Sequence, residues 1–151
     1  MEAFASAGMV KASAMDIGRF LMTMLAEGVT PDGTRAVSSE SLAETWAAQI
    51  EVQPGPWLNI FKSALSWNVA DYEGITVVTK DGALGGFAAN IAFIPEAGTG
   101  IVVRSNLDFP TLVSAVHWRP VELFYGLEHN VEERLTPGIQ GYMGSLSEAY
   151  T

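Results

Sequence analysis

Three closely spaced apolar runs between residues 75 and 104 constrain the fold of this chain more than any other feature. The runs cover residues 75–79, 87–94 and 101–104, and short glycine-containing segments separate them. Each run has the length and the β-branched or aromatic content of a strand. Parallel strands need a crossover of about a dozen residues or more, which these connections do not provide. The sequence therefore predicts an antiparallel meander.

Both faces of this sheet are predicted to be covered by other elements. In the run 87–94 the alternate positions are apolar on both faces, and Asn90 is the only polar residue. A further strand over residues 65–71 leads through a hairpin turn at Glu73-Gly74 into the run that starts at residue 75. The predicted fold class is α+β, with an antiparallel sheet flanked by helices.

A first helix is predicted over residues 14–27. Ser13 is placed as its N-cap, with Asp16 three residues on in a capping box, and Gly28 as its C′ residue. The apolar positions of this helix cover more than one stripe, so the helix needs cover on more than one side. Its expected buried face consists of Ile17, Phe20, Leu21, Met24 and Leu25, and Met15 and Met22 widen that face.

Two more helices are predicted further along the chain. One covers residues 39–49 after a cap at Ser38 or Ser39, and a break at residues 54–56 follows it. The last begins at about residue 111, runs to residue 127, and is expected to kink or restart at Pro120. Residues 1–127 are predicted to form one domain. Residues 128–151 form a polar C-terminal tail whose order the sequence leaves open.

The composition excludes several classes of function. The chain of 151 residues carries a formal net charge of −9, with 8 Lys and Arg against 17 Asp and Glu, and has no basic run. Nucleic acids and anionic membrane surfaces require clustered cations, so neither is an expected partner. No apolar run approaches the roughly 20 residues of a membrane span. With no cysteine and only His117 and His129, far apart, neither a metal site nor a cofactor is predicted.

The residues Lys80-Asp81-Gly82 resemble the third active-site motif, Lys-Thr-Gly, of the serine β-lactamase and penicillin-binding-protein superfamily. Other stretches resemble, in the same order, the C-terminal half of class C β-lactamases, D-aminopeptidases and family VIII esterases. These are a small-residue loop and helix start at 8–20, an "S-P-E-S"-like helix start at 38–42, an "L-G-W"-like strand at 65–67, and the strand and turn at 86–96. The resemblance extends over about residues 7–127.

The resemblance implies acyl transfer through a serine ester. Lys80 would be the cation beside the nucleophile's hydroxyl and the substrate carboxylate. Gly82 would let the strand edge approach the bound substrate, because a Cβ atom would intrude. The backbone N–H of Ala83 would be one of two oxyanion-hole donors, and the other would belong to the nucleophilic serine.

Departures from the family pattern change the expected substrate. Asp81 replaces the motif's threonine, and its carboxylate would repel a β-lactam carboxylate and could neutralise Lys80 by pairing. Asp108 and Thr111 stand where class C enzymes have amides that could meet such a carboxylate. The substrate-binding set is therefore Asp81, Gly82, Asp108 and Thr111, and it favours small-molecule esters or peptide-like amides over penicillins.

The nucleophile itself is missing. No serine is followed three residues later by lysine, and none of the four tyrosines begins Tyr-x-Asn. In the family both motifs precede the matched region, so we expect the chain to begin midway through the parent fold and to be inactive alone. The sheet and the wide-faced first helix would then lack part of their cover. The expected partner is a complementing N-terminal half or a further copy of the chain.

Two functions of different kinds are open at this point. The first is a part of a serine hydrolase that acts on an ester or an amide. The second is a non-catalytic binding or structural module that retains the fold and self-associates. A third reading, in which another serine of this chain serves as the nucleophile, has no motif to support it. The sequence does not indicate a compartment.

Overall fold

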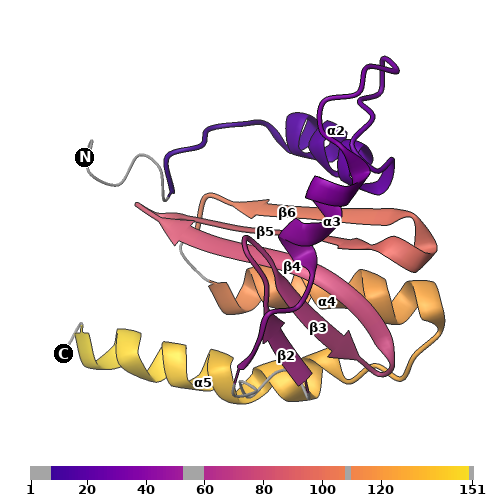
Figure 1. Cartoon of the computed structure of the whole chain (residues 1–151). Coiled ribbons are helices and arrows are strands. Elements are labelled where there is room, and N and C mark those ends of the chain that lie inside the picture. Colours follow the sequence, from indigo (N-terminus) through magenta and orange to yellow (C-terminus); the bar gives the residue numbers. More distant parts are fainter. Residues whose placement is uncertain (1–7, 53–59, 108–109, 150–151) are drawn as a thin grey trace.

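A six-stranded antiparallel sheet forms the centre of the protein (Figure 1). The computed structural model describes residues 8–52, 60–107 and 110–149. Each strand pairs with its neighbours in sequence, so the order in the sheet is the order in the chain. The predicted meander and the α+β class are confirmed. The strands are β1 (Ile50–Val52), β2 (Ile60–Ser63), β3 (Asn68–Tyr72), β4 (Ile75–Leu84), β5 (Phe87–Ile94) and β6 (Thr99–Ser105).

Helices cover both faces of the sheet, as the apolar pattern predicts. Figure 1 shows α2 (Ala14–Leu25) and α3 (Ser39–Trp46) on one face, and α4 (Pro110–Tyr125) and α5 (Val131–Ala149) on the other. A 3₁₀ turn, η2 (Pro95–Ala97), joins β5 to β6. Within the described ranges, no helix is long and apolar enough to cross a membrane.

Each face has its own hydrophobic core. On the α2 side the ring of Phe93 lies edge-on to Trp46 and Trp67, with ring centroids 5.0 and 5.2 Å apart. On the α4 side the Tyr72 and Trp118 rings stack at 4.9 Å. The α2-side core contains Leu21, Met24, Leu42, Trp67, Val78 and Phe93, and the α4-side core contains Ala70, Tyr72, Val77, Ala92, Ile94, Trp118, Val121, Val131 and Leu135.

Two hairpin turns of the same kind fix the register of β4. The predicted Glu73-Gly74 turn joins β3 to β4, and Gly85-Gly86 joins β4 to β5. All four residues have positive φ. Positive φ at both central positions is the mark of a type I′ turn, whose twist matches that of the flanking strands. The pairs that close the two hairpins are Tyr72–Ile75 and Leu84–Phe87.

The first helix begins as predicted but ends earlier. Ser13 and Asp16 form the full capping box. The helix stops at Leu25, and Glu27 takes the left-handed conformation that the sequence assigns to Gly28. Gly28 N–H donates to the Thr23 carbonyl at 2.8 Å, which makes the end a Schellman motif. Gly28 is still required, because a Cβ there would clash with the backbone of Val37.

Other boundaries differ from the sequence prediction. The strands β1 and β2 were not predicted, the strand placed at 65–71 begins only at Asn68, and α3 ends at Trp46 instead of residue 49. Helix α4 runs through Pro120 without a restart, since Pro120 and Val116 lie on the exposed side, where water can reach the unpaired carbonyl. The tail contains a 19-residue helix, α5. Asp108, which precedes the last predicted helix, lies outside the described residues.

Candidate functional site

The Lys80 motif lies on the part of β4 that extends past β3. The last pair between these strands is Asn68–Thr79, whereas the pairing with β5 continues to Leu84. Residues 80–84 therefore have a strand partner on one side only, within the part of the chain that the structure describes. An open strand edge presents free backbone N–H and C=O groups to another chain or a ligand.

The backbone of Ala83 points out from this open edge. A two-residue hairpin closes on a hydrogen-bonded pair, and hydrogen-bonded pairs alternate along an antiparallel ladder. Counting back from Leu84–Phe87 makes Gly82 and Lys80 bond inward to β5. Ala83 and Asp81 then direct their N–H and C=O groups outward. Counting from Tyr72–Ile75, the pair that closes the β3–β4 hairpin, gives the same alternation. Thr79 then forms a hydrogen-bonded pair with Asn68 of β3, so the next residue, Lys80, bonds to β5.

Side chains of the motif alternate between the two faces of the sheet. Lys80 and Gly82 share a face with Val78, which lies in the α2-side core. Asp81 is on the opposite face with the buried Thr79. Lys80 and Asp81 are both exposed, and among the described residues no ion pair joins them. The geometry therefore separates the two charges that sequence reasoning had set side by side.

Nothing within the described chain explains why residue 82 is a glycine. Its φ lies outside the left-handed region, and a Cβ built on it would meet no heavy atom within 4 Å. Gly100 is a useful contrast, because a Cβ there would come within 3.1 Å of the Leu21 side chain. Packing thus accounts for Gly100 and leaves the space above Gly82 open.

A groove with a volume of about 940 Å³ runs across this end of the sheet. Four segments line it: residues 8–12, 82–84, 87–89 and 104–106. Figure 1 shows the segment before α2 lying beside the tip of the β4–β5 hairpin. Arg104 ties this segment to the sheet, because its Nη1 donates a hydrogen bond to the Ala12 carbonyl.

The groove differs in part from the predicted set of site residues. Gly82 and Ala83 line it, whereas Lys80 lies two residue pairs further along the β4–β5 ladder. Asp108 is outside the described residues; Thr111 lies in the first turn of α4, and its side chain is likewise undescribed. The cations Lys11 and Arg104 were missed. Recognition of Arg104 requires the strand register, which sets it beside Ala89. Recognition of Lys11 requires the tertiary fold that brings residues 8–12 to the β4–β5 hairpin.

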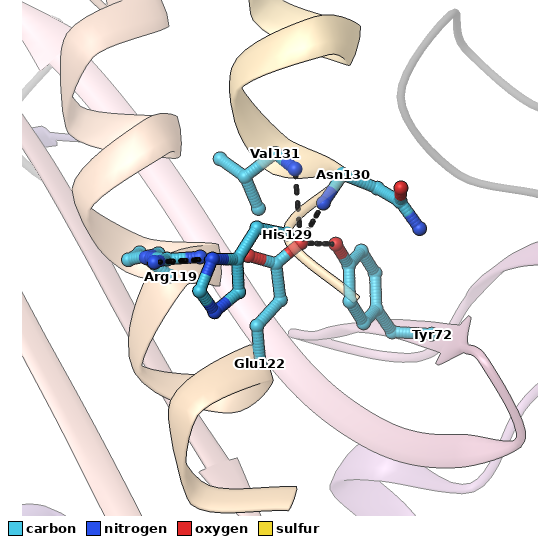
Figure 2. A network of polar contacts seen from close by, with 6 residues as sticks. All are labelled: Tyr72, Arg119, Glu122, His129, Asn130 and Val131. Carbon is cyan, nitrogen blue, oxygen red and sulfur yellow. Dashed lines mark hydrogen bonds and ion pairs between the residues drawn. The ribbon is translucent and has the colours of Figure 1, made fainter. Parts of the chain in front are cut away.

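A second polar cluster surrounds the fully buried carboxylate of Glu122 on α4. Figure 2 shows Tyr72, Arg119 and the start of α5 converging on it. Its Oε1 accepts the Tyr72 hydroxyl at 2.7 Å and the backbone N–H groups of Asn130 and Val131 at 2.8 and 2.9 Å. Arg119 Nη1 donates to Oε2 at 3.0 Å, and Arg119 Nη2 lies 2.9 Å from His129 Nδ1.

The hydrogen bonds outweigh burial in setting the charge of Glu122. Burial alone would raise the pKa of this carboxyl, but the donors around it lower the pKa overall. Burial and the hydrogen bond to Glu122 raise the pKa of Tyr72 far above its ordinary value. The carboxylate caps two free N–H groups at the start of α5 and joins β3, α4 and α5. This role is structural, and the cluster lies in the α4-side core rather than at the groove.

His117 is the other buried titratable group. It is fully buried on α4, with its ring edge-on to Trp118, and neither ring nitrogen has a hydrogen-bond partner among the described residues. Burial lowers the pKa of His117 to about 4, so the ring is neutral at pH 7. The described residues contain no group of three or more His, Cys, Asp or Glu side chains that could hold a metal ion.

Comparisons with known proteins agree with this fold. The family model described as Beta-lactamase matches residues 1–124. Penicillin-binding protein 4 of Amycolatopsis lactamdurans is 32% identical over 104 residues, which cover 66% of this chain and 26% of that protein. The hydrolase ungD′ of Aspergillus campestris, named for unguisins, is 30% identical over 74 residues, 48% of this chain and 14% of that protein.

One solved structure shows the same fold at low sequence identity. The octameric penicillin-binding protein homologue from Pyrococcus abyssi superposes with a TM-score of 0.65 and 20% identity, over 79% of this chain. The match covers 25% of that protein's chain. The chain thus spans about a quarter or less of the length of these relatives.

Proposed function

Because the chain belongs to the beta-lactamase family, we propose that it is one part of a serine hydrolase that cleaves an ester or an amide through an acyl-enzyme. In this proposal the nucleophilic serine and the Tyr-x-Asn motif come from outside these 151 residues. The chain supplies the strand edge that holds the substrate and one donor of the oxyanion hole.

The open edge of β4 is the observation that carries this proposal. Residues 80–84 extend past β3, Ala83 directs its N–H out from the open edge, and no heavy atom of the described residues lies within 4 Å of a Cβ built on Gly82. A glycine that neither backbone conformation nor packing explains suits the close approach of a ligand. An extended substrate would add to this edge as a further strand.

The chemistry assigns a separate role to each residue. The external serine oxygen bonds to the substrate carbonyl carbon, its proton passes to a neighbouring base, and the carbonyl oxygen becomes an oxyanion. The Ala83 N–H would donate a hydrogen bond to that oxyanion. Lys80, exposed on the α2-side face, would stabilise the deprotonated serine by its charge. Loss of the alcohol or amine leaves the acyl-enzyme, which water then hydrolyses.

Asp81 bears on which substrates are accepted. Its exposed carboxylate replaces a hydroxyl on the motif strand and places negative charge at the edge where a substrate would lie. We expect this charge to disfavour substrates that carry a carboxylate at the penicillin position. The family model ends at residue 124, which supports a hydrolase domain over residues 1–127. The segment 128–151 lies beyond that match, but its helix α5 packs into the α4-side core through Val131 and Leu135.

A chimera tests the proposal. This chain would replace the region it matches in Penicillin-binding protein 4 of Amycolatopsis lactamdurans, and labelling by a fluorophosphonate probe would be followed by intact mass. We expect a single adduct. The variant Lys80→Ala should slow labelling at least about 100-fold. The control Lys62→Ala, on β2 and two strands away from β4, should leave the labelling rate unchanged. Equal rates for both variants would contradict the proposal.

A second candidate function is a non-catalytic module that self-associates. Large apolar side chains are exposed on α2 and α4, including Met15 at 70% and Phe124 at 62% of their surface. Such surfaces favour association. Sedimentation of the purified chain at micromolar to millimolar concentration distinguishes a chain that self-associates from one that stays monomeric. Association that Phe124→Glu abolishes, together with an inert chimera, would favour this module. A monomer at every concentration would exclude it.

A further inference from the structure

The outer side of helices α4 and α5 is an apolar surface that carries no unpaired charge among the described residues. Residues 110–125 contain two charged side chains, Arg119 and the buried Glu122, which pair at 3.0 Å, and residues 135–147 contain none. Charged residues make up 17% of the chain, so a surface of this size would ordinarily carry several. Six large apolar side chains are exposed here instead, and we call them the α4–α5 face: Leu112, Val116, Leu123, Phe124, Ile139 and Met143.

On α4 the exposed apolar positions point away from the sheet. At 3.6 residues per turn, Leu112, Val116 and Leu123 lie on the side of the helix opposite Val121, which is in the α4-side core. Phe124 continues this surface at the end of the helix. The exposed fractions of the four side chains run from 41% to 62%. This part of the face is therefore the outer surface of α4.

On α5 the exposed apolar positions lie on the flank next to α4. Figure 1 shows α5 running back along α4 in the opposite direction. Val131 faces the core, and Arg134 reaches from one flank of α5 to Glu73 on the β3 side. Ile139 and Met143 lie on the other flank, so they join the exposed side chains of α4 in one continuous face.

The second half of α5 needs cover that the described chain does not supply. After Leu135 none of its described side chains is buried. The same stretch contains Pro137 and three glycines, and these are the two least favourable residue types in a helix interior. A helix of this composition is not stable in water without packing. A partner that covers Ile139 and Met143 would stabilise this stretch.

Charge favours a second copy of the chain as that partner. Two copies that each carry a net charge of −9 repel each other, so they approach most easily where charge is absent. A cationic partner would gain more from the acidic remainder of the surface. Ile139 and Met143 also lie beyond the family match, which ends at residue 124, so the parts of the family fold that are absent from this chain do not account for the whole face.

The area of the face also suits a dimer. A standard interface buries about 800 Å² per partner, and roughly two thirds of a homodimer interface is apolar. At roughly 150–200 Å² for a whole large side chain, the exposed fractions of the six residues leave on the order of 500 Å² of apolar surface on each copy. The polar groups on the face are uncharged, such as the exposed Gln140 amide, and trapped water satisfies groups of this kind in interfaces.

We propose that the α4–α5 face is the interface of a homodimer, in which two copies of the chain pack through this face about a two-fold axis. The contact is isologous, so α4 and α5 of each copy lie against the same two helices of the other and form a layer of helices between two sheets. The groove at the open edge of β4 stays accessible, because the segment before α2 that lines it is on the opposite side of the sheet. The inference is independent of whether the chain takes part in hydrolysis.

Sedimentation velocity of the purified chain at pH 7, from micromolar to millimolar concentration, tests the interface. We expect a concentration-dependent dimer and no larger species, because an isologous contact is closed. Raising the salt to 0.5 M should strengthen association, since the two acidic copies then repel each other less. Hydrogen exchange of the backbone amides in residues 136–149 should slow as the dimer forms. Association that salt weakens would indicate an ionic interface and would overturn the inference.

Two variants place a carboxylate in the face, and a matched variant places one elsewhere. Leu123→Glu and Met143→Glu should each weaken the dimer at least about 100-fold, because the symmetry buries the new charge twice. Met15→Glu, at a side chain that is 70% exposed on α2 across the sheet, should change the dimerisation constant by less than about threefold. Circular dichroism should show that all three variants are folded.

A monomer at every concentration would overturn the inference, and so would a dimer that neither face variant weakens or that Met15→Glu disrupts as strongly as Leu123→Glu does. A monomeric chimera with Penicillin-binding protein 4, in which the α5 amides are protected, would also overturn it, because the face would then belong to another part of that protein. Probe labelling of the chimera does not depend on the dimer, so a failure to label would contradict the proposed hydrolase alone.

Discussion

The hydroxyl of Tyr72 donates a 2.7 Å hydrogen bond to the buried carboxylate of Glu122, across 50 residues of sequence. Through it, strand β3, helix α4 and the start of α5 meet at one charged group (Figure 2). The C-terminal helix is therefore anchored by a contact that no local pattern near residue 131 encodes.

Removing this carboxylate should be the costliest single change in the polar interior. Glu122→Ala leaves the Tyr72 hydroxyl, two backbone N–H groups and Arg119 without their acceptor, so we expect a loss of about 3–5 kcal/mol in the free energy of unfolding. Urea denaturation measures it. The exposed Glu128→Ala should change stability by no more than about 0.5 kcal/mol. A loss below about 1 kcal/mol for Glu122→Ala would show that the network is not formed.

Stability should fall as the pH drops from 7 to 5, because of His117. Its pKa is about 4 in the folded protein and ordinarily 6.5, so in this window the unfolded chain binds a proton that the folded chain does not. The expected fall is about 2 kcal/mol. Glu122, whose lowered pKa makes it stabilising above the ordinary carboxyl range, contributes its own loss only at still lower pH.

The variant His117→Leu isolates this effect. It removes two buried ring nitrogens that have no hydrogen-bond partner in the described part of the chain, so stability at pH 7 should be equal or higher. The slope of the unfolding free energy between pH 7 and 5 should be nearly lost. His129→Gln, an exposed position, should keep the slope. A slope that survives in His117→Leu would place the titrating group elsewhere.

Two glycines of the sheet should respond differently to alanine. Gly100→Ala sets a methyl about 3.1 Å from Leu21, where α2 crosses β6, and should cost about 1–3 kcal/mol. In Gly82→Ala the new methyl has no atom of the described residues within 4 Å, so stability should be unchanged or rise by up to about 1 kcal/mol. In the chimera, Gly82→Ala should nonetheless slow probe labelling. Thermal unfolding of both variants and their labelling rates provide the comparison; a destabilised Gly82→Ala would mean that the glycine serves the fold.

The cap of α2 offers a smaller, local test. Ser13 accepts a hydrogen bond from the Asp16 N–H and donates one to the Asp16 carboxylate at 2.6 Å. Ser13→Ala should cost about 1 kcal/mol, measured by urea denaturation. Ser39→Ala, just inside α3, is the matched control, because the cap of that helix is Ser38. Equal effects of the two variants would argue against the capping box.

Sequence reasoning succeeded where local signals agree with the final structure. The strand at 87–94 was predicted with the bounds that β5 has, because an apolar run and glycine turns delimit it on both sides. The hairpin at Glu73-Gly74 and the cap at Ser13 carry their own residue signals in the same way. The motif residues Lys80 and Gly82 were recognised by pattern, and the register then placed them at an open edge.

The missed features depend on contacts between distant residues. The strands β1 and β2 have three and four residues, and their pairing with neighbours, not their own pattern, makes them strands. Helix α5 contains Pro137 and three glycines, which have low helix propensity, so its own sequence does not predict a helix. Its start is fixed by a hydrogen bond to Glu122. Arg104 can be assigned to the groove only when the pairing of β5 with β6 is known.

Treatment of the purified chain with a fluorophosphonate probe, read out by intact mass, tests the central claim most directly. The account predicts an unmodified mass from protein that circular dichroism shows to be folded, because the strand edge and the oxyanion donor are present but the activated serine is not. A single stoichiometric adduct that disappears in Lys80→Ala would contradict it, since the chain would then carry its own nucleophile.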